Sequence, residues 1–414
     1  MPIAGPDAVG SSLAMTIAET EVALAAWLDL GVNHERGGTF AAIGLERISA
    51  FLRHLPTPPA PLTVAGTKGK GSTVRLVEAA LRAHGLPTVA FTSPHVSCLN
   101  ERWRIDGEPA NWAVLAAAAG TVQAVLDQHP AELTWFERSF ALAVVLAASR
   151  PGVHFLCEVG LGGRLDCANA LDAAVVVITH LSHDHRDVLG PTLSHIAREK
   201  LAVARVGRPL VIAPQTTEAG AAIRACLPPG REAQWIVTSR EPVPLTLEGA
   251  HQQGNAAAAL AAAAALYPAL DRNRALAGMA GAGLAARCQV IEQPARRLLI
   301  DGAHNGPSLA ATVAVAAARL RPGWRLILAL ASDKEVEEVL AAIPPEVIVR
   351  RCGYASPRAR GAEAWPARAL AWPWHADIGA ALAAEPDADL CISGSLYLAG
   401  EALRALGHGG RLPG

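Results

Sequence analysis

The chain has 414 residues, of which 51% are hydrophobic and 18% charged, and its formal net charge is −1. This balance excludes a disordered acidic or basic chain and gives no overall attraction to nucleic acid. The length predicts two to three domains with sizeable cores, so we expect a globular protein without a nucleic-acid partner.

The seven cysteines are scattered and form no CxxC pair, which is typical of free thiols in a reducing cytosol. Residues 1–12 lack the basic segment and long apolar core of a signal peptide. The Ala-rich stretch 255–270 comes nearest to a membrane span, but Pro268 interrupts it and a buried helix explains it better. We expect a cytoplasmic protein with no membrane contact.

Strand-like and helical patterns alternate along the first part of the chain. Such alternation predicts a mostly parallel sheet with helices on both faces. The expected strands are 62–65, 88–92, 153–159, 174–178 and 209–213, and the expected helices are 73–85, 112–128, 137–149, 192–205 and 219–226.

A second alternation begins near Arg287 and predicts a second, smaller α/β domain. We place the boundary near 284–288, which divides the chain into residues 1–285 and 286–414. The segment 352–373 is rich in Pro, Gly and Arg and is predicted to be a long surface loop. The expected strands are 297–300, 325–330, 347–350 and 389–392, and the expected helices are 308–319, 335–342 and 396–406.

The most informative motif is residues 64–73, VAGTKGKGST, between an expected strand and an expected helix. Glycines let backbone N–H groups approach an anion, and the helix N-terminus adds a favourable dipole. Lys70 supplies a positive charge for β- and γ-phosphates, and the Ser72 hydroxyl can reach Mg²⁺. Val64 and Gly71 depart from the general P-loop pattern, so the match is to a variant. We predict a nucleoside triphosphate site; the alternative is an ordinary glycine-rich turn.

Two polar segments come where expected strands end, the place where ligand groups gather in parallel sheets. Glu158 begins the segment EVGLGGRLD, and a carboxylate beside a phosphate loop suits Mg²⁺, although it could instead cap a turn. The segment HLSHDH, 180–185, has Ser182 where the paired-zinc pattern HxHxDH needs histidine. A single histidine ligand with Asp184 beside it fits a phosphate site better, and a solvated turn remains the alternative.

Lys200 lies on the helix expected after this segment, where a lysine is ordinarily solvated. Within a metal site it could react with CO₂ to give a carbamate, an anion able to ligate Mg²⁺. The segment LIDGAHN, 299–305, runs from an expected strand into a polar loop. Asp301 could hold a ribose hydroxyl and His304 could face the nucleotide across a cleft; an ordinary β-turn is the alternative.

Taken together, the motifs resemble the folylpolyglutamate synthase/dihydrofolate synthase family, within the Mur-ligase-like ATP-dependent amide ligases. The resemblance extends from about residue 27 to residue 400, and the order of the motifs is specific. They are GTKGKGS, TSPHV, NERWRIDG, TWFE, EVGLGGRLD, DHRDVLG, IAREK, HQQGNAA, DGAHN and GSLYLAG.

The resemblance implies an α/β protein with an N-terminal P-loop domain of the Mur-ligase central type. A smaller Rossmann-like glutamate-ligase domain would follow, with ATP and substrates between the two. The implied activity forms an acyl phosphate on the carboxylate of dihydropteroate or a folyl-(poly)glutamate, which L-glutamate then attacks. Such an enzyme would bind ATP, L-glutamate and a pteroate or reduced folate, and family members are commonly monomers.

The resemblance also implies roles for matching residues. Ser93 and Glu158 would ligate one Mg²⁺, and His185 with carbamylated Lys200 would hold a second. His304 would lie close to the transferred phosphate, and Lys70, Lys200 and Asp301 would also serve catalysis. The nucleotide would be bound by Gly69, Lys70, Gly71, Ser72, Asn255, Arg287 and Asp301. The substrates would be bordered by Thr134, Trp135, Phe136, Glu137, Arg164, Leu165 and Asp166, with Ser395 near the glutamate side.

The chain departs from the family pattern at several positions. Lys68 stands where the family usually has asparagine, and Gly306 stands where it has proline. The usual PGR before the domain boundary is replaced by residues 285–287, AAR. Many members have aspartate at the position of Ala42, near the dihydropteroate pocket, so the glutamate-ligase chemistry is better supported than addition to dihydropteroate.

Two alternatives to this function remain. One is a Mur-type ligase that acts on another carboxylate. The other is a nucleotide-binding regulator that kept the P-loop and lost ligation. Glu158, His185 and Lys200 argue against the regulator, because a protein that only binds nucleotide has no need of a second metal ion.

Overall fold

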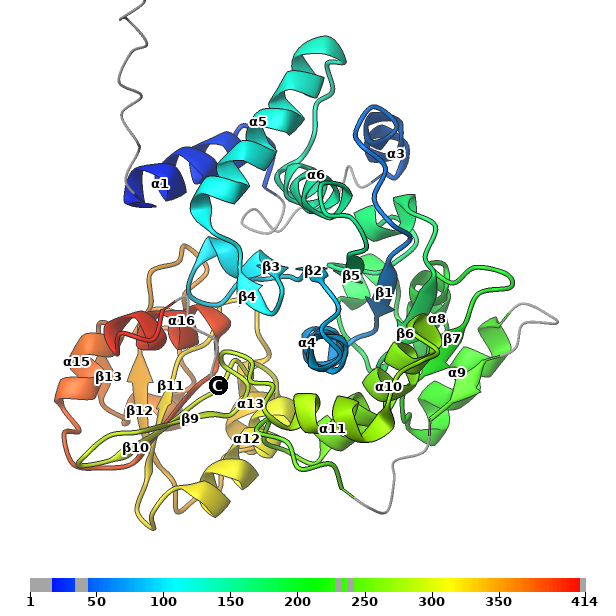
Figure 1. Ribbon diagram of the computed structural model, residues 1–414. Coiled ribbons are helices and arrows are strands. Elements are labelled where there is room, and N and C mark those ends of the chain that lie inside the picture. Colours follow the sequence, from blue (N-terminus) through cyan, green and yellow to red (C-terminus); the bar gives the residue numbers. More distant parts are fainter. Residues whose placement is uncertain (1–16, 34–43, 228–232, 237–241, 410–414) are drawn as a thin grey trace, which may run out of the picture.

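The computed structural model describes residues 17–33, 44–227, 233–236 and 242–409. Ala42, singled out above, lies outside these residues. Two α/β units lie side by side, each built on its own sheet (Figure 1). The predicted class, with a large, mostly parallel sheet and a second, smaller one, is confirmed.

The first sheet has the strand order β4-β3-β2-β5-β1-β6-β7-β8 in the described part of the chain. Its pairings are parallel except those that β3 makes with β2 and β4. Strand β1 lies between β5 and β6 and is buried along its length, which explains its uninterrupted apolar run. The strands are β1 (Leu62–Ala65), β2 (Thr88–Phe91), β3 (Trp103–Ile105), β4 (Glu108–Pro109), β5 (His154–Glu158), β6 (Val175–Ile178), β7 (Leu210–Ile212) and β8 (Gln234–Trp235).

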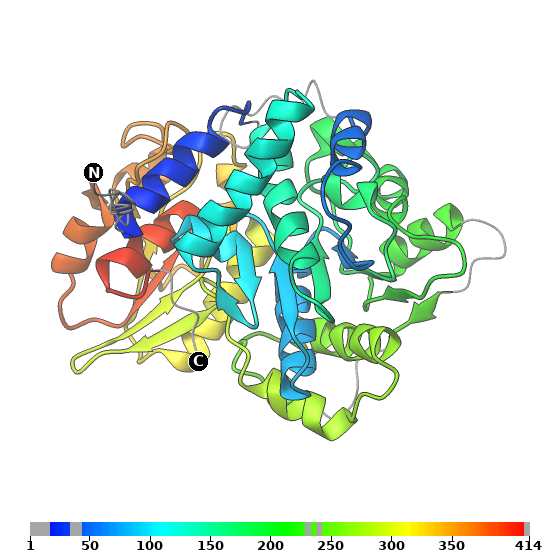
Figure 2. The same ribbon diagram turned by 45° about the horizontal axis from the view of Figure 1, so that its top comes forward.

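Helices cover both faces of this sheet (Figures 1 and 2). One face carries α4 (Lys70–Ala83), α10 (His251–Leu266) and α11 (Arg272–Ala280), which share one apolar core. The Ala-rich stretch is therefore a buried helix, and no helix in the described ranges is long and apolar enough to cross a membrane. The other face carries α1 (Ile17–Leu28), α3 (Glu46–Leu52), α5 (Trp112–Gln128), α6 (Trp135–Ala148), α8 (Leu193–Leu201) and α9 (Thr217–Cys226).

The second sheet has the order β13-β12-β11-β14-β10-β9, with β9 antiparallel at one edge. Because α11 ends at Ala280 and β9 begins at Gln289, the predicted boundary falls in the connection between the units; the domain limits remain a prediction. The strands are β9 (Gln289–Glu292), β10 (Arg297–Ile300), β11 (Arg325–Leu328), β12 (Ile348–Cys352), β13 (Trp374–His375) and β14 (Leu390–Ser393). The helices are α12 (Gly306–Arg319), α13 (Val336–Ala341), α14 (Ala367–Leu370), α15 (Ile378–Ala383) and α16 (Leu396–Ala405).

The segment 352–373 was predicted to be a surface loop. Much of it is exposed, but residues 352–354, Trp365 and Ala369 are buried, and Ala367–Leu370 form a short helix, α14. Arg351 donates to the main-chain carbonyls of Ala362 and Trp372 at 2.6 and 3.1 Å. Its guanidinium lies 5.9 Å from the ring centroid of Trp365, which is only 5% exposed. One arginine of β12 therefore holds the segment at several points, a long-range effect that local composition does not reveal.

A buried ion network fixes α4 against the β3 strand. Glu78 accepts from Arg104 Nε at 2.7 Å and from Arg75 Nη1 at 3.2 Å. Arg104 also donates to Thr92 Oγ1 at 3.2 Å, next to Ser93. Removal of Glu78 would leave the buried Arg104 without an ion-pair partner in this network, so the network holds the end of β2 in place relative to α4.

Candidate active site

The glycine-rich loop between β1 and α4 packs more tightly than any side chain would permit. Gly66 has φ 149°, and a Cβ there would overlap the side chain of Thr179. Gly69 has φ 87°, and a Cβ there would overlap the side chain of Asn255. The loop thus has the close backbone packing and left-handed turn that a phosphate-binding loop requires.

The start of α4 faces the end of β5. A Cβ added at Gly71 would lie 3.4 Å from Glu158 Oε2. Glu158 accepts from the Ser93 backbone N–H at 3.1 Å, so the ends of β2 and β5 meet beside the loop. Lys70 Nζ donates to Thr67 O at 3.4 Å and lies close to the same carboxylate. The structure thus brings together residues from three separate motifs.

Glu158 is 5% exposed. Burial raises its pKa, and Lys70, the Ser93 N–H group and Arg287 oppose that shift. A buried carboxylate of this kind suits a cation as its partner. In the described residues no three His, Cys, Asp or Glu side chains form a metal-binding group, so a cation here would draw further oxygen ligands from water or phosphate, as Mg²⁺ commonly does.

Lys200, on α8, is 4% exposed and is therefore not the solvated lysine that its position suggests. Burial lowers its pKa to about 7, and repulsion from Lys70 adds to the shift. Burial also lowers the pKa of His185, whose charged neighbours include Asp184, Lys70 and Lys200. His185 is the N-cap of α7 (Arg186–Leu189) and has φ 47°. The predicted ligands of the second metal, His185 and Lys200, thus both lie within the electrostatic influence of Lys70 in the glycine-rich loop.

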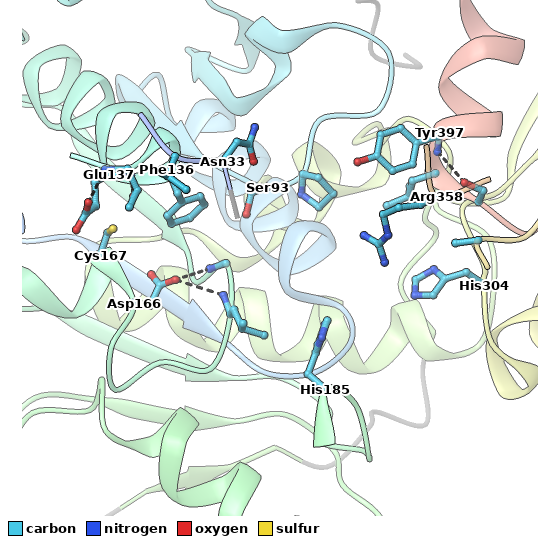
Figure 3. A pocket seen from close by; sticks show the side chains of 18 of the residues that line it. Asn33, Ser93, Phe136, Glu137, Asp166, Cys167, His185, His304, Arg358 and Tyr397 are labelled. Atoms are coloured by element: carbon cyan, nitrogen blue, oxygen red, sulfur yellow. Dashed lines mark hydrogen bonds between the residues drawn. The ribbon is translucent and has the colours of Figure 1, made fainter. Parts of the chain in front are cut away.

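A cavity of 380 Å³ lies between the two units and is lined from both (Figure 3). Asp166 lies at its N-terminal side and accepts from Gly160 N at 2.9 Å and Leu161 N at 3.3 Å. Burial raises the pKa of Asp166 to about 6. Predicted residues that line the cavity from the N-terminal unit are Ser93, Thr134, Phe136, Glu137, Leu165, Asp166 and His185.

Two residues predicted to border the substrate do not line this cavity. The Arg164 side chain is 54% exposed and pairs with Glu199 at 2.8 Å. Trp135 is 4% exposed, with the guanidinium of Arg102 4.5 Å from its ring centroid. Neighbours along a helix or turn point in different directions, so a motif matched as a block includes residues that face away from the site.

The C-terminal unit contributes His304, Lys334, Tyr354, Arg358, Ser395 and Tyr397 to the cavity (Figure 3). Ser395 caps α16 and its hydroxyl accepts from Tyr397 N at 3.2 Å. The rings of Tyr354 and Tyr397 are nearly parallel, with centroids 6.0 Å apart. Lys334, Arg358 and both tyrosines were not predicted from the sequence. Lys334 and Tyr354 follow the carboxyl ends of β11 and β12, where ligand-binding residues gather in parallel sheets, so their position could have indicated a role in the site.

Asp301 follows β10 and accepts from Cys288 N at 2.9 Å, Ala303 N at 2.8 Å and Thr312 Oγ1 at 2.8 Å. These contacts make the loop after β10 rigid. All of them are made within the C-terminal unit, so the carboxylate shapes the loop whether or not it also contacts a nucleotide.

The residues predicted to lie near the nucleotide also include His304, Arg287 and Asn255. His304 Nδ1 lies 2.9 Å from Gly302 O, and because a carbonyl only accepts, Nδ1 carries a proton and Nε2 is the basic nitrogen. Burial lowers the pKa of His304, and Lys334 and Arg287 lower it further. Asn255 is 5% exposed and donates to Gln252 Oε1 at 2.8 Å while its side chain contacts Gly69.

No protein-family model matches the sequence, but curated proteins do. The chain is 34% identical over 312 residues to the dihydrofolate synthase/folylpolyglutamate synthase of Escherichia coli, covering 68% of this chain and 70% of that protein. It is 31% identical over 414 residues to the Mycobacterium tuberculosis protein of the same name, covering 87% and 84%. The chain belongs to the folylpolyglutamate synthase/dihydrofolate synthase family.

Solved structures of this family have the same fold. Mycobacterium tuberculosis folylpolyglutamate synthase complexed with ADP and AMPPCP matches with a TM-score of 0.81 at 28% identity, over 96% of this chain and 100% of that one. E. coli FolC in complex with DHPP and ADP matches at 0.79 and 27%, over 93% and 97%. A bifunctional synthase with Mn, AMPPNP and L-glutamate bound matches at 0.78 and 28%, over 93% and 98%. The family consists of ATP-dependent glutamate ligases.

Gly69→Ala is expected to weaken ADP binding by at least about tenfold, or about 1.4 kcal/mol, because the added Cβ would displace Asn255 and the loop. Gly85→Ala is the matched control, since Gly85 also has positive φ, 73°, but an added Cβ meets nothing within 4 Å. Titration calorimetry with ADP compares the two variants. Equal affinities would contradict the assignment of the loop.

Proposed function

We propose that this chain is an ATP-dependent ligase that adds L-glutamate to dihydropteroate, to folyl-(poly)glutamate, or to both. The observation that carries the proposal is the 380 Å³ cavity, which joins Ser93 and His185 of one unit to Lys334 and Arg358 of the other. Related structures hold DHPP with ADP, and L-glutamate with Mn and AMPPNP. A flat ring suits the Phe136 side of the cavity, and an anionic amino acid suits the side with two cations.

The arrangement fits activation of a carboxylate by phosphoryl transfer. A carboxylate is a poor acylating agent until one of its oxygens leaves as phosphate. Transfer of the γ-phosphoryl group brings two anions together, and Lys70 at the start of α4 would offset part of that charge. Attack of the glutamate amine on the acyl phosphate forms the amide and releases phosphate. Enclosure between two units would keep water from hydrolysing the intermediate.

The residues present fit two magnesium ions. Ser93 and Glu158 offer hard oxygen ligands for the first ion, and Glu158 is a buried carboxylate close to three cationic groups. His185 and Lys200 would hold the second ion after Lys200 reacts with CO₂ to form a carbamate. That reaction needs a neutral amine, and a pKa of about 7 gives Lys200 a large neutral fraction near neutrality. Bound magnesium would offset the charge of the triphosphate and the acyl group.

His304 is our candidate for the base that takes a proton from the glutamate amine. Its lowered pKa keeps it neutral at pH 7, and Nε2 is free to accept because Nδ1 donates to Gly302 O. The nucleotide would be held by Gly69, Lys70, Gly71, Ser72, Asn255, Arg287 and Asp301. The acceptor would be bordered by Thr134, Phe136, Glu137, Leu165 and Asp166, and the glutamate by Ser395. Trp135 and Arg164, predicted with them, do not line the cavity.

Three further features of the proposal come from the sequence. We propose a monomer, because the family commonly is one. We propose a cytoplasmic location, in keeping with the free cysteines. We also propose domain limits of 1–285 and 286–414, which assign each sheet to one domain.

The purified protein is expected to release phosphate from ATP at its full rate only with L-glutamate and an acceptor both present. A coupled phosphate assay that compares dihydropteroate with tetrahydrofolate tests this and shows which acceptor is used. Release that needs neither compound would identify a nucleotide-binding regulator. Release that needs a different carboxylate would identify another amide ligase, and either result would overturn the proposal.

Lys200→Ala is expected to abolish turnover, and added bicarbonate should not restore it. Arg198→Ala, an exposed position on the same helix, is the matched control. With ¹³C-labelled bicarbonate, NMR should show a carbamate signal in the wild type and in Arg198→Ala but not in Lys200→Ala. The signal should grow as pH rises through about 7, because only the neutral amine reacts. Full turnover in Lys200→Ala would show that catalysis does not need a carbamate on Lys200.

A further inference from the structure

The side chain of Lys68 crosses from the glycine-rich loop to the first turn of α12. Its Nζ donates to Asn305 Oδ1 at 3.2 Å and to Ser308 Oγ at 3.0 Å. Asn305 is the N-cap of α12 and accepts from Ser308 N at 3.1 Å. One lysine of the N-terminal unit thus binds the cap of a helix in the C-terminal unit.

Both ends of this bridge are fixed by their own surroundings. The backbone N–H of Lys68 donates to His180 O at 3.2 Å, and the neighbouring Gly69 packs against Asn255. At the other end, Asn305 directly follows the loop that the Asp301 hydrogen bonds make rigid. A shift of one loop relative to the other is therefore passed on through the lysine and is not absorbed by flexible backbone.

The charges around Lys68 also come from both units. Burial lowers its pKa, and Asp184 of the N-terminal unit and Glu338 of α13 oppose the shift. A half-buried ammonium that donates to two acceptors and lies near two carboxylates gains most when the units are close together. Separation of the units would return Lys68 to water and leave Glu338 without this neighbour.

We propose that Lys68 is a positioning residue that couples nucleotide binding at the glycine-rich loop to the placement of the His304 loop. The inference rests on the proposed ligase function. His304 precedes Asn305, so a lysine that holds the cap also sets where His304 points in the cavity. Asparagine, the residue that the resembled family usually has here, is two bonds shorter and cannot make the same bridge unless the units move.

Two other polar contacts between the units lie away from the loop. Arg404 Nη1 donates to Ser97 O at 2.8 Å, and Arg319 pairs with Glu248 at 3.3 Å. These contacts hold the units together but touch neither the loop nor the segment 301–305. A variant that lacks one of these contacts therefore shows the effect of a looser interface while the Lys68 bridge is kept.

Loss of the bridge has a distinct chemical consequence. The acyl phosphate can still form, because Lys70 and the rest of the loop are unchanged. The amine and its base are then held less well, and water attacks instead, giving back the carboxylate and free phosphate. ATP would be consumed without amide formation, so the ratio of phosphate released to amide formed would rise.

Lys68→Asn is the test, with Arg319→Ala as the matched control. In Lys68→Asn we expect the rate of amide formation to fall by about 10- to 100-fold, as for a small misplacement of reacting groups, and the phosphate-to-amide ratio to rise severalfold. The Kd for ADP should stay within about threefold, well under one tenfold step. Arg319→Ala should match the wild type in all three. Lys68→Arg, which can still reach Asn305, should keep most of the coupling.

Unchanged rate and ratio in Lys68→Asn would overturn the proposal. A rise in the Kd for ADP as large as the fall in rate would also overturn it, because Lys68 would then act as a phosphate ligand.

Hydrogen exchange gives a readout that needs no ligase activity. ADP should protect amides 66–75 in both the wild type and Lys68→Asn, but amides 305–312 only in the wild type. Protection of 305–312 in both would contradict the coupling. If the wild type makes no amide, the proposed function fails, while this comparison still decides the role of Lys68.

Discussion

The site depends on how closely α10 approaches the glycine-rich loop. The alanines of α10 pack into the same core as α4, and small side chains let the two helices lie near each other. That approach brings Asn255 onto the backbone of Gly69, where no side chain would fit. The Ala-rich helix α10 therefore sets the position of the glycine-rich loop.

Charge determines what the site can hold. Lys70, Lys200 and Lys334 all lower the pKa of His185. The pKa of Lys200 is lowered mainly by burial, and repulsion from Lys70 adds to the shift. Glu158 lies near Lys70, and Asp166 and Asp184 act on Lys200, so these carboxylates offset part of the positive charge. The negative charges of the triphosphate and of the acceptor carboxylate would face these lysines, so the cavity is suited to a reaction between anions.

Those parts of the site that depend on short-range backbone geometry were predicted from the sequence. The glycine-rich turn and the position of Glu158 at a strand end both follow from local rules. The burial of Lys200 does not, because it depends on how α8 packs. The outward direction of Arg164 and the bridge from Lys68 to α12 likewise require the relative placement of distant segments, and the short β3–β4 hairpin has too few residues for its alternation to be recognised.

The central claim is that the carboxylate of the acceptor takes phosphate from ATP before the amine attacks. An acceptor labelled with oxygen-18 in its carboxylate tests this directly, with mass spectrometry of the released phosphate. The account predicts one labelled oxygen in each phosphate released with an amide, because that oxygen bridges carbon and phosphorus in the intermediate. Amide formation that releases unlabelled phosphate would contradict it.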